Sequence, residues 1–200
     1  MKVLVVYAHP EPESTVGRMY NAVHEELVHL GHDVRLHDLY EERFVPVMSD
    51  YERKNHSTAL EPKLKLFPEL APYVENLKWC EALVLVYPTW WSGQPAIMKG
   101  WVDRVFVNEV AWTLPDGENR IRPLLTNIRR LVVVTTHGST KFVNALEGES
   151  GKRTAFRSLR LMMHWRTRCK WIAFYKFDRL DEVQKAKAVT QVRRQIRRTL

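Results

Sequence analysis

Three short segments of the 200-residue chain combine histidine, hydroxyl and aromatic side chains with the prolines and glycines that shape turns. They are AHPEPESTVG (8–17), YPTWWSG (87–93) and TTHGS (135–139). Side chains of these types can hold a flat, phosphorylated ligand and donate hydrogen bonds to it.

In the first segment, Ser14 and Thr15 stand where the N-cap of a helix belongs. A helix N-terminus offers unpaired N–H groups and a positive dipole end to a phosphate, and His9 could add a hydrogen bond. The alternative is that Ser14 only caps the helix. Neither G-x-G-x-x-G nor G-x-x-x-x-G-K-[ST] occurs, which excludes a dinucleotide fingerprint and a P-loop.

The second segment places Trp90 and Trp91 side by side on a turn between Pro88 and Gly93. A fixed turn lets the backbone amides of residues 89–92 point toward ring heteroatoms, while the indoles flank or stack on a flat conjugated ligand. A tryptophan pair is more often part of a core, but its position directly after a strand favours a ligand.

In the third segment, two small hydroxyl residues and a glycine let the loop approach a ligand closely. His137 could donate to a polar atom or to a developing negative charge. A lone histidine is more often a surface or hydrogen-bonded residue. Three such segments, each at a strand end, make a ligand site the better interpretation.

The elements that must position these segments are short apolar runs. Three of them, KVLVVY (2–7), ALVLVY (82–87) and LVVVTT (131–136), are nearly continuous, as in parallel strands covered on both faces. WIAFYKF (171–177) predicts a further strand, and the more alternating DVRLHDLY (33–40) predicts a strand nearer an edge.

Helical patterns separate these strands. Apolar residues spaced by three and four predict a helix that stops at Gly31, a second over Ile97–Phe106 and a last one ending near Leu200. Residues 41–70, with three prolines, predict a long excursion with one helical stretch. The chain is therefore expected to be one α/β domain over residues 1–200, a flavodoxin-like doubly wound parallel sheet of order 2-1-3-4-5.

Composition narrows the class further. The chain is 45% hydrophobic and 27% charged, as in ordinary globular proteins. Cys80 and Cys169 are far apart, which argues against a disulfide framework or zinc site and suits a reducing compartment. No metal is predicted from the histidine spacing. No signal-peptide core or membrane span is found, so the sequence predicts a cytoplasmic protein.

Charge is unevenly distributed along the chain. Residues 151–200 hold 15 Lys and Arg against three Asp and Glu, whereas residues 1–150 hold 16 against 20. Such asymmetry can indicate a membrane-surface or nucleic-acid patch. A solvated helical face, or a patch that receives a phosphorylated cofactor, are the alternatives. Nucleic-acid binding is disfavoured because no helix-turn-helix, aromatic RNA-binding motif or zinc finger accompanies the patch.

Together, AHPEPEST, YPTWWSGQPAIMKGWVDRVF with the later VAW, and TTHG resemble the NAD(P)H:quinone oxidoreductases of the flavodoxin-like superfamily. The DT-diaphorase type and its bacterial relatives carry a similar H-[SP]…S and a P-x-x-W-[FW]-[GS] turn. In these proteins a P-A-x-x-K-G-W-x-[DE]-R-V-F helix follows the turn, and a T-T-x-G segment comes later. The resemblance covers most of the chain and is strongest over residues 2–16 and 84–138.

The resemblance implies a tightly bound flavin, FAD or in some relatives FMN. NAD(P)H would pass a hydride to the flavin, and a quinone or similar acceptor would then take two electrons at the same place in a ping-pong cycle. His137 is the candidate for stabilising the reduced ring. The flavin-binding residues carried over by position are His9, Ser14, Thr15, Val16, Pro88, Thr89, Trp90, Trp91, Ser92, Thr135, Thr136, His137 and Gly138.

Some positions depart from the family pattern. Val16-Gly17 replaces the Phe-Asn pair of many relatives, on the adenine side of the site. Trp112 and Leu114 match an aromatic pair over the substrate pocket, and KFVNALEGESG lacks a clear match for a Tyr and a His of the family.

Relatives are mostly dimers with the site at the subunit interface, so a homodimer is expected. The alternative function is a regulatory flavoprotein subunit of a potassium-efflux-type transport system. The basic C-terminal region could serve such docking, or docking at an anionic membrane.

Overall fold

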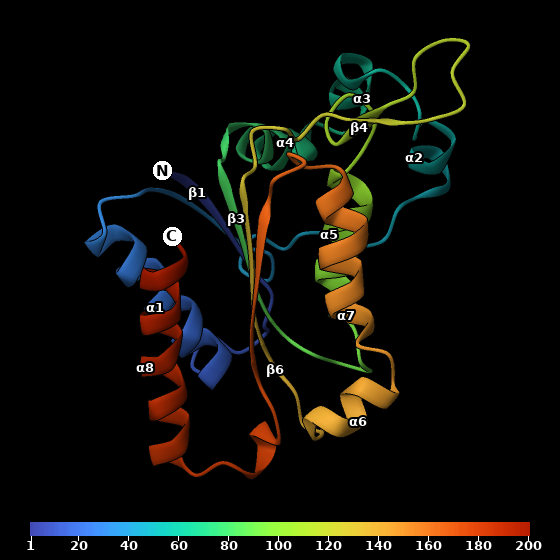
Figure 1. The fold of residues 1–200 in the computed structure, drawn as a ribbon. Coiled ribbons are helices and arrows are strands. Elements are labelled where there is room, and N and C mark those ends of the chain that lie inside the picture. Colours follow the sequence, from blue (N-terminus) through green and yellow to red (C-terminus); the bar gives the residue numbers. More distant parts are fainter.

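The computed structural model describes all 200 residues. A five-stranded parallel sheet in the order β2-β1-β3-β6-β7 forms its centre, which confirms the predicted flavodoxin-like topology (Figure 1). The predicted edge position of the second strand is also confirmed. The strands are β1 (Lys2–Tyr7), β2 (Asp33–Asp38), β3 (Ala82–Pro88), β6 (Arg130–Thr136) and β7 (Arg168–Phe174).

Helices cover both faces of the sheet, which is why its three central strands are almost wholly buried. On one face, α1 (Thr15–His29) and α8 (Glu182–Thr199) lie side by side (Figure 1). On the other lie α4 (Ala71–Trp79), α5 (Ala96–Val105) and α7 (Ser150–Arg153). The sheet therefore separates two apolar cores, of 30 and 17 buried residues.

Local signals fix the helix ends near the predicted positions. The Ser14 side chain accepts from the N–H of Gly17 at 3.1 Å and begins α1. Asp181 and Gln184 form a capping box that begins α8. The last strand differs from the prediction, because β7 begins at Arg168 and ends at Phe174 rather than covering 171–177. Its register against β6 sets these limits, and as an edge strand it tolerates polar residues.

The excursion after β2 contains more helix than the single stretch predicted. It forms α2 (Asp50–Lys54), α3 (Leu60–Leu66) and a 3-10 turn over Pro68–Leu70. Buried Arg104 of α5 holds it in place, donating from Nε to both carboxylate oxygens of Glu52 at 2.8 and 2.9 Å and from Nη2 to Glu69 at 2.8 Å. These bonds give the arginine of the WVDRVF motif a structural role.

The remaining elements lie at the periphery. β4 (Trp112–Thr113) and β5 (Arg122–Pro123) form a small antiparallel ladder that the sequence did not predict. α6 (Lys141–Leu146) follows β6, and a 3-10 turn over Phe177–Arg179 precedes α8. α7 continues into a π-helical turn over Thr154–Leu159. None of the helices combines the length and apolarity needed to cross a bilayer.

Candidate functional site

Two of the three predicted segments meet in one cavity at the carboxyl edge of the sheet. The cavity has a volume of about 250 Å³. The first segment borders a larger neighbouring cavity of about 580 Å³, between α1 and the end of β2. The ring centroids of His9 and Trp90 lie 6.4 Å apart, so the two regions adjoin. The smaller cavity is lined by Thr89, Trp91, Ser92, His137, Gly138, Ser139, Asn144 and Glu147.

The tryptophan turn is a two-residue hairpin. Trp90 and Gly93 exchange backbone hydrogen bonds of 3.1 and 3.0 Å, and Trp91 and Ser92 between them have φ values of 46° and 61°. Positive φ at both central positions defines a type I′ turn, which normally requires Asn-Gly. Backbone strain in non-glycine residues persists where surrounding contacts enforce it, and it clusters at ligand sites.

Those contacts come from the segment that follows β6. The Ser92 hydroxyl donates to the Glu147 carboxylate, and the Ser150 hydroxyl donates to the Ser92 carbonyl. The N–H of Gly151 donates to the same carbonyl at 3.2 Å. The side chain of Trp91, by contrast, is fully exposed. The turn is thus held from behind while its indole projects outward.

Thr89 joins the turn to the neighbouring strand. Its N–H donates to the Thr136 carbonyl at 2.8 Å, and its hydroxyl lies 2.9 Å from the Thr135 hydroxyl. Pro88, the last residue of β3, is buried. Thr135 and Pro88 therefore support the turn from the sheet, and Thr89, Trp91 and Ser92 face the cavity.

His137 is buried, with 6% of its surface exposed. Its ring stacks on Tyr175 at a centroid distance of 4.8 Å and an angle of 14°. Neither ring nitrogen has a hydrogen-bond partner. The nearby amide of Asn144 donates to Ser139 and Thr140.

The protonation state of His137 follows from this position. Burial lowers the pKa of the imidazole below its ordinary value, against opposing contributions from the Asn144 side chain and the carboxylates of Glu149 and Glu147. The ring is neutral at pH 7, so one nitrogen can donate and the other can accept a hydrogen bond.

The start of α1 has the features of a phosphate site. Ser14 satisfies the N–H of Gly17, while the N–H groups of Thr15 and Val16 have no partner in the chain. His9 Nδ1 accepts from the N–H of Glu11 at 3.0 Å, which fixes its ring in the loop. The side chain of Val16 packs in the core, so only its backbone faces this site.

The expected substrate-pocket residues lie elsewhere in the chain. Trp112 donates its indole N–H to the Phe106 carbonyl at 3.1 Å, and Leu114 is exposed just beyond β4. In Figure 1 this segment projects from the end of the molecule opposite α6. Neither residue lines the smaller cavity. Their role in substrate binding stays a prediction.

Three residues of the site region lie outside the segments that the sequence predicts: Asn144, Glu147 and Tyr175. Thr140 caps α6, which places Asn144 and Glu147 against the tryptophan turn. The spacing of Asn144 and Glu147 predicts no ligand site, because Asn144 bonds only within its own segment and the partner of Glu147, Ser92, lies 55 residues away. Tyr175 was assigned to a strand, whereas it lies just after β7.

Comparison with known proteins agrees with the flavodoxin-like fold. A family model described as flavodoxin-like fold matches residues 1–200. The "Ribosyldihydronicotinamide dehydrogenase-like protein traD" of Penicillium crustosum is 32% identical over 171 residues, 76% of this chain and 62% of that protein. The human "Ribosyldihydronicotinamide dehydrogenase [quinone]" is 30% identical over 152 residues, 70% of this chain and 65% of that protein. The chain thus spans less than two thirds of these relatives.

Solved structures cover the chain more completely. Smu.1420 from Streptococcus mutans UA159 superposes with a TM-score of 0.82 and 26% identity, covering 99% of this chain and 100% of that one. An NAD(P)H:quinone oxidoreductase from Methanothermobacter marburgensis has a TM-score of 0.78 at 22% identity, covering 98% and 94%. At that identity the second likeness shows the fold alone.

Proposed function

The chain belongs to the flavodoxin-like fold family, and from that membership we propose that it is a flavin-dependent NAD(P)H oxidoreductase that reduces quinones by two electrons. Azo and nitro compounds are acceptors of the same kind. One observation supports this function above the others: the Trp91 turn and the unpartnered His137 ring share one cavity. Such a cavity suits the edge of a flat conjugated ring that carries polar heteroatoms.

The residues present fit a flavin at both of its ends. Buried polar atoms without partners are uncommon in folded proteins, and both nitrogens of His137 are such atoms at the cavity wall. The free N–H groups of Thr15 and Val16 offer a second, phosphate-binding end. When bound, a flavin supplies the redox chemistry, taking a hydride from NAD(P)H and passing two electrons to the acceptor in a ping-pong exchange.

The protein's part is to bind and orient. Ser14, Thr15 and Val16 hold the phosphate through the helix start, and His9 lies beside them. Pro88 and the residues after it form the rigid wall of the ring site. Its members are Thr89, Trp90, Trp91 and Ser92, with Thr135, Thr136, His137 and Gly138 closing the far edge.

His137 is the proposed catalytic residue. A neutral imidazole with a free N–H can donate a hydrogen bond to negative charge that develops on a bound ring. Stacking on Tyr175 keeps its ring in one plane, so the donor is in place before reaction. Preorganised donors of this kind lower the barrier because no reorganisation is needed at the moment of charge transfer.

We assign FAD as the cofactor, with FMN as the alternative. The larger cavity adjoins the helix start and provides space beyond one phosphate. Its wall includes the stacked rings of Tyr7 and Tyr20, 4.4 Å apart, and Asp38 at the end of β2. The carboxylate of Asp38 can accept a hydrogen bond from a ribose hydroxyl. Burial raises the pKa of Tyr7 to about 12, so its hydroxyl stays protonated.

A homodimer is the proposed assembly. Trp112 and Leu114 can contact an acceptor at the smaller cavity only if a second copy of the chain brings them there, because they lie on a distant segment of their own chain. The exposed indole of Trp91 also remains available for such a neighbour.

The deciding experiment is reconstitution of the purified protein with FAD or FMN, followed by anaerobic addition of NADH or NADPH and then a soluble quinone. Bleaching of the flavin by the nucleotide, and its return with the quinone, is the expected result. A protein that binds neither flavin contradicts the proposal. Flavin that binds and bleaches without turnover would instead favour a regulatory flavoprotein.

A further inference from the structure

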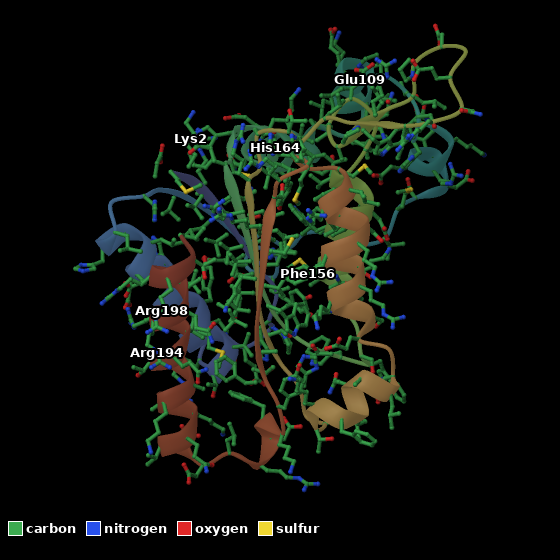
Figure 2. All side chains as sticks on the ribbon, in the orientation of Figure 1. Lys2, Glu109, Phe156, His164, Arg194 and Arg198 are labelled. Carbon is green, nitrogen blue, oxygen red and sulfur yellow. The ribbon has the colours of Figure 1, made fainter.

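Part of the positive charge of the C-terminal quarter lies on α8. On α8, Arg193 pairs with Glu25 and Arg197 pairs with Glu26, both on α1. These two arginines therefore fasten one helix to the other. Arg194 and Arg198 lie on the exposed side of α8, without ion pairs (Figure 2). A second cationic surface lies at the amino-terminal ends of β6 and β7 and draws its residues from both parts of the chain.

We name this second surface the basic edge, after its five cations. Arg130 of β6 and Arg168 of β7 are direct partners in the parallel register, and the N–H of Arg168 donates to the Arg129 carbonyl at 3.1 Å. Partial desolvation and the nearby Arg129 and Arg166 guanidinium groups lower the pKa of His164. The basic edge consists of Arg129, Arg130, Arg166, Arg168 and Lys170.

None of these five cations forms an ion pair, although thirteen ion pairs occur elsewhere in the molecule. The carboxylate of Glu81, at this end of the sheet, accepts instead from the N–H of Lys2 at 2.9 Å. Like charges opposite one another on neighbouring strands are destabilising. The pairing of Arg130 with Arg168 thus places two like charges side by side, and an external anion would neutralise them.

An exposed indole stands beside the cations. Trp165 is 77% exposed, and the guanidinium carbon of Arg166 lies 5.3 Å from its ring centroid. Arg160 donates to the carbonyls of Trp165 and Thr167, which fixes the loop. Leu161 is exposed as well. Tryptophan beside arginine is typical of surfaces that contact the headgroup region of a bilayer.

The shape of the surface favours a lipid layer over a polymer. Five cavities of about 250 to 580 Å³ have linings that include no cation of the basic edge. Single-stranded nucleic acids bind in grooves. An extended peptide binds in a pocket or pairs with an open strand edge, and pairing along β7 would use backbone groups rather than the five cations. A layer of anionic headgroups needs only a charged surface with an amphipathic side chain at its centre.

We propose that the basic edge docks the protein on an anionic membrane surface, with Trp165 at the headgroup level. The basic edge lies at the amino-terminal ends of β6 and β7, near His164 (Figure 2), whereas the smaller cavity lies beyond the carboxyl ends of β3 and β6. Binding of lipid therefore does not depend on the proposed redox function, and each can fail without the other.

Vesicle flotation of the full-length protein tests this. Vesicles of phosphatidylcholine with about 30% phosphatidylserine are expected to carry the protein at low salt, and pure phosphatidylcholine vesicles are not. Arg130→Gln with Arg168→Gln is expected to weaken binding roughly thirtyfold, from the usual contribution of each cation near an anionic surface. The matched control, Arg157→Gln with Arg179→Gln, removes the same charge elsewhere and is expected to change binding little.

Thermal unfolding shows whether the double variant loses lipid binding because it no longer folds. The Arg130/Arg168 double variant is expected to melt at or above the wild-type temperature, because a repulsion has been relieved. Equal loss in the control variant would overturn the proposal, since net charge alone would then explain the binding. The absence of flotation at low salt would also overturn the proposal, as would binding of the protein to RNA rather than to vesicles.

Discussion

The Ser92 hydroxyl donates to the Glu147 carboxylate across 55 residues of sequence. This bond ties the turn after β3 to the end of α6, and the turn carries the fully exposed Trp91. A strained type I′ turn without glycine needs such a support to remain in one conformation. The turn that carries Trp91 forms one wall of the proposed flavin site. Its rigidity thus depends on Glu147, a residue whose position in the sequence does not indicate a role in ligand binding.

Removing this support is expected to loosen the flavin. Glu147→Ala should weaken binding of FAD or FMN to the apoprotein about tenfold, the equivalent of one hydrogen bond to a charged group. Glu147→Gln keeps an acceptor oxygen and should lose less. Flavin fluorescence titration measures both. Equal affinities for all three proteins would mean that the turn holds without Glu147.

Trp91→Ala is expected to separate flavin binding from folding. The indole makes no buried contact within the chain, so the free energy of unfolding of the apoprotein should change by less than about 0.5 kcal/mol. Flavin retention through gel filtration should fall. Trp165→Ala, which removes another exposed indole at the far end, serves as the control. Unchanged flavin content in Trp91→Ala would contradict the placement of the ring.

His137 is expected to make stability depend on pH. Its pKa is lower in the folded chain than in the unfolded chain, where it is about 6.5, so the unfolded state binds more protons as the pH falls. The contribution of His137 to the free energy of unfolding is fully present above the unfolded-state pKa. It is lost as the pH falls through the folded-state pKa. His137→Gln should therefore flatten the decline of unfolding free energy below about pH 6.5 in urea titrations. An unaltered slope would show that other histidines cause the decline.

His137→Gln is also expected to slow turnover by a larger factor than it weakens flavin binding. Loss of one preorganised donor costs about 100-fold or more in kcat at sites of this type. Glutamine retains an N–H and should act better than alanine. Stopped-flow reduction by NAD(P)H, with flavin content measured in parallel, distinguishes a catalytic role from a binding one. Wild-type rates in His137→Ala would remove His137 from the mechanism.

A mixing experiment tests whether Trp91 of one subunit and Trp112 of the other form a common acceptor site. Trp91→Ala and Trp112→Ala should each lower quinone reduction as purified dimers. After the two variants are unfolded and refolded together, heterodimers should contain one site with both native tryptophans, so part of the activity should return. Light scattering reports the oligomeric state directly. No recovery from a confirmed mixed dimer would place Trp112 outside the acceptor pocket.

Much of the fold could be predicted because local signals agreed with tertiary packing. The continuous apolar runs of β1, β3 and β6 indicated strands covered on both faces, and the strand order followed from their alternation with helices. The limits of β7 were wrong because register against β6, rather than the aromatic run, defines that strand. The excursion depends on buried Arg104 and Glu52, a pair separated by 52 residues that no local pattern indicates.

The residues of the candidate site also fall into two groups, those that the sequence could predict and those that it could not. Trp91 and His137 could be identified because each follows a buried strand, and strand ends meet at one edge. Glu147, Asn144 and Tyr175 could not, because their importance comes from the partners they reach. The type I′ geometry was hidden as well, since Trp-Ser at its centre contradicts the usual preference for Asn-Gly.

All five strands run in one direction, so the two ends of the sheet differ chemically. A protein resting on a bilayer by its basic edge would turn its cavity toward the surrounding water. Nucleotides would reach that cavity freely, whereas long-tailed quinones embedded in the lipid would not. The direction of the strands would then select electron acceptors by their solubility, before any contact with Trp91 could select them by shape.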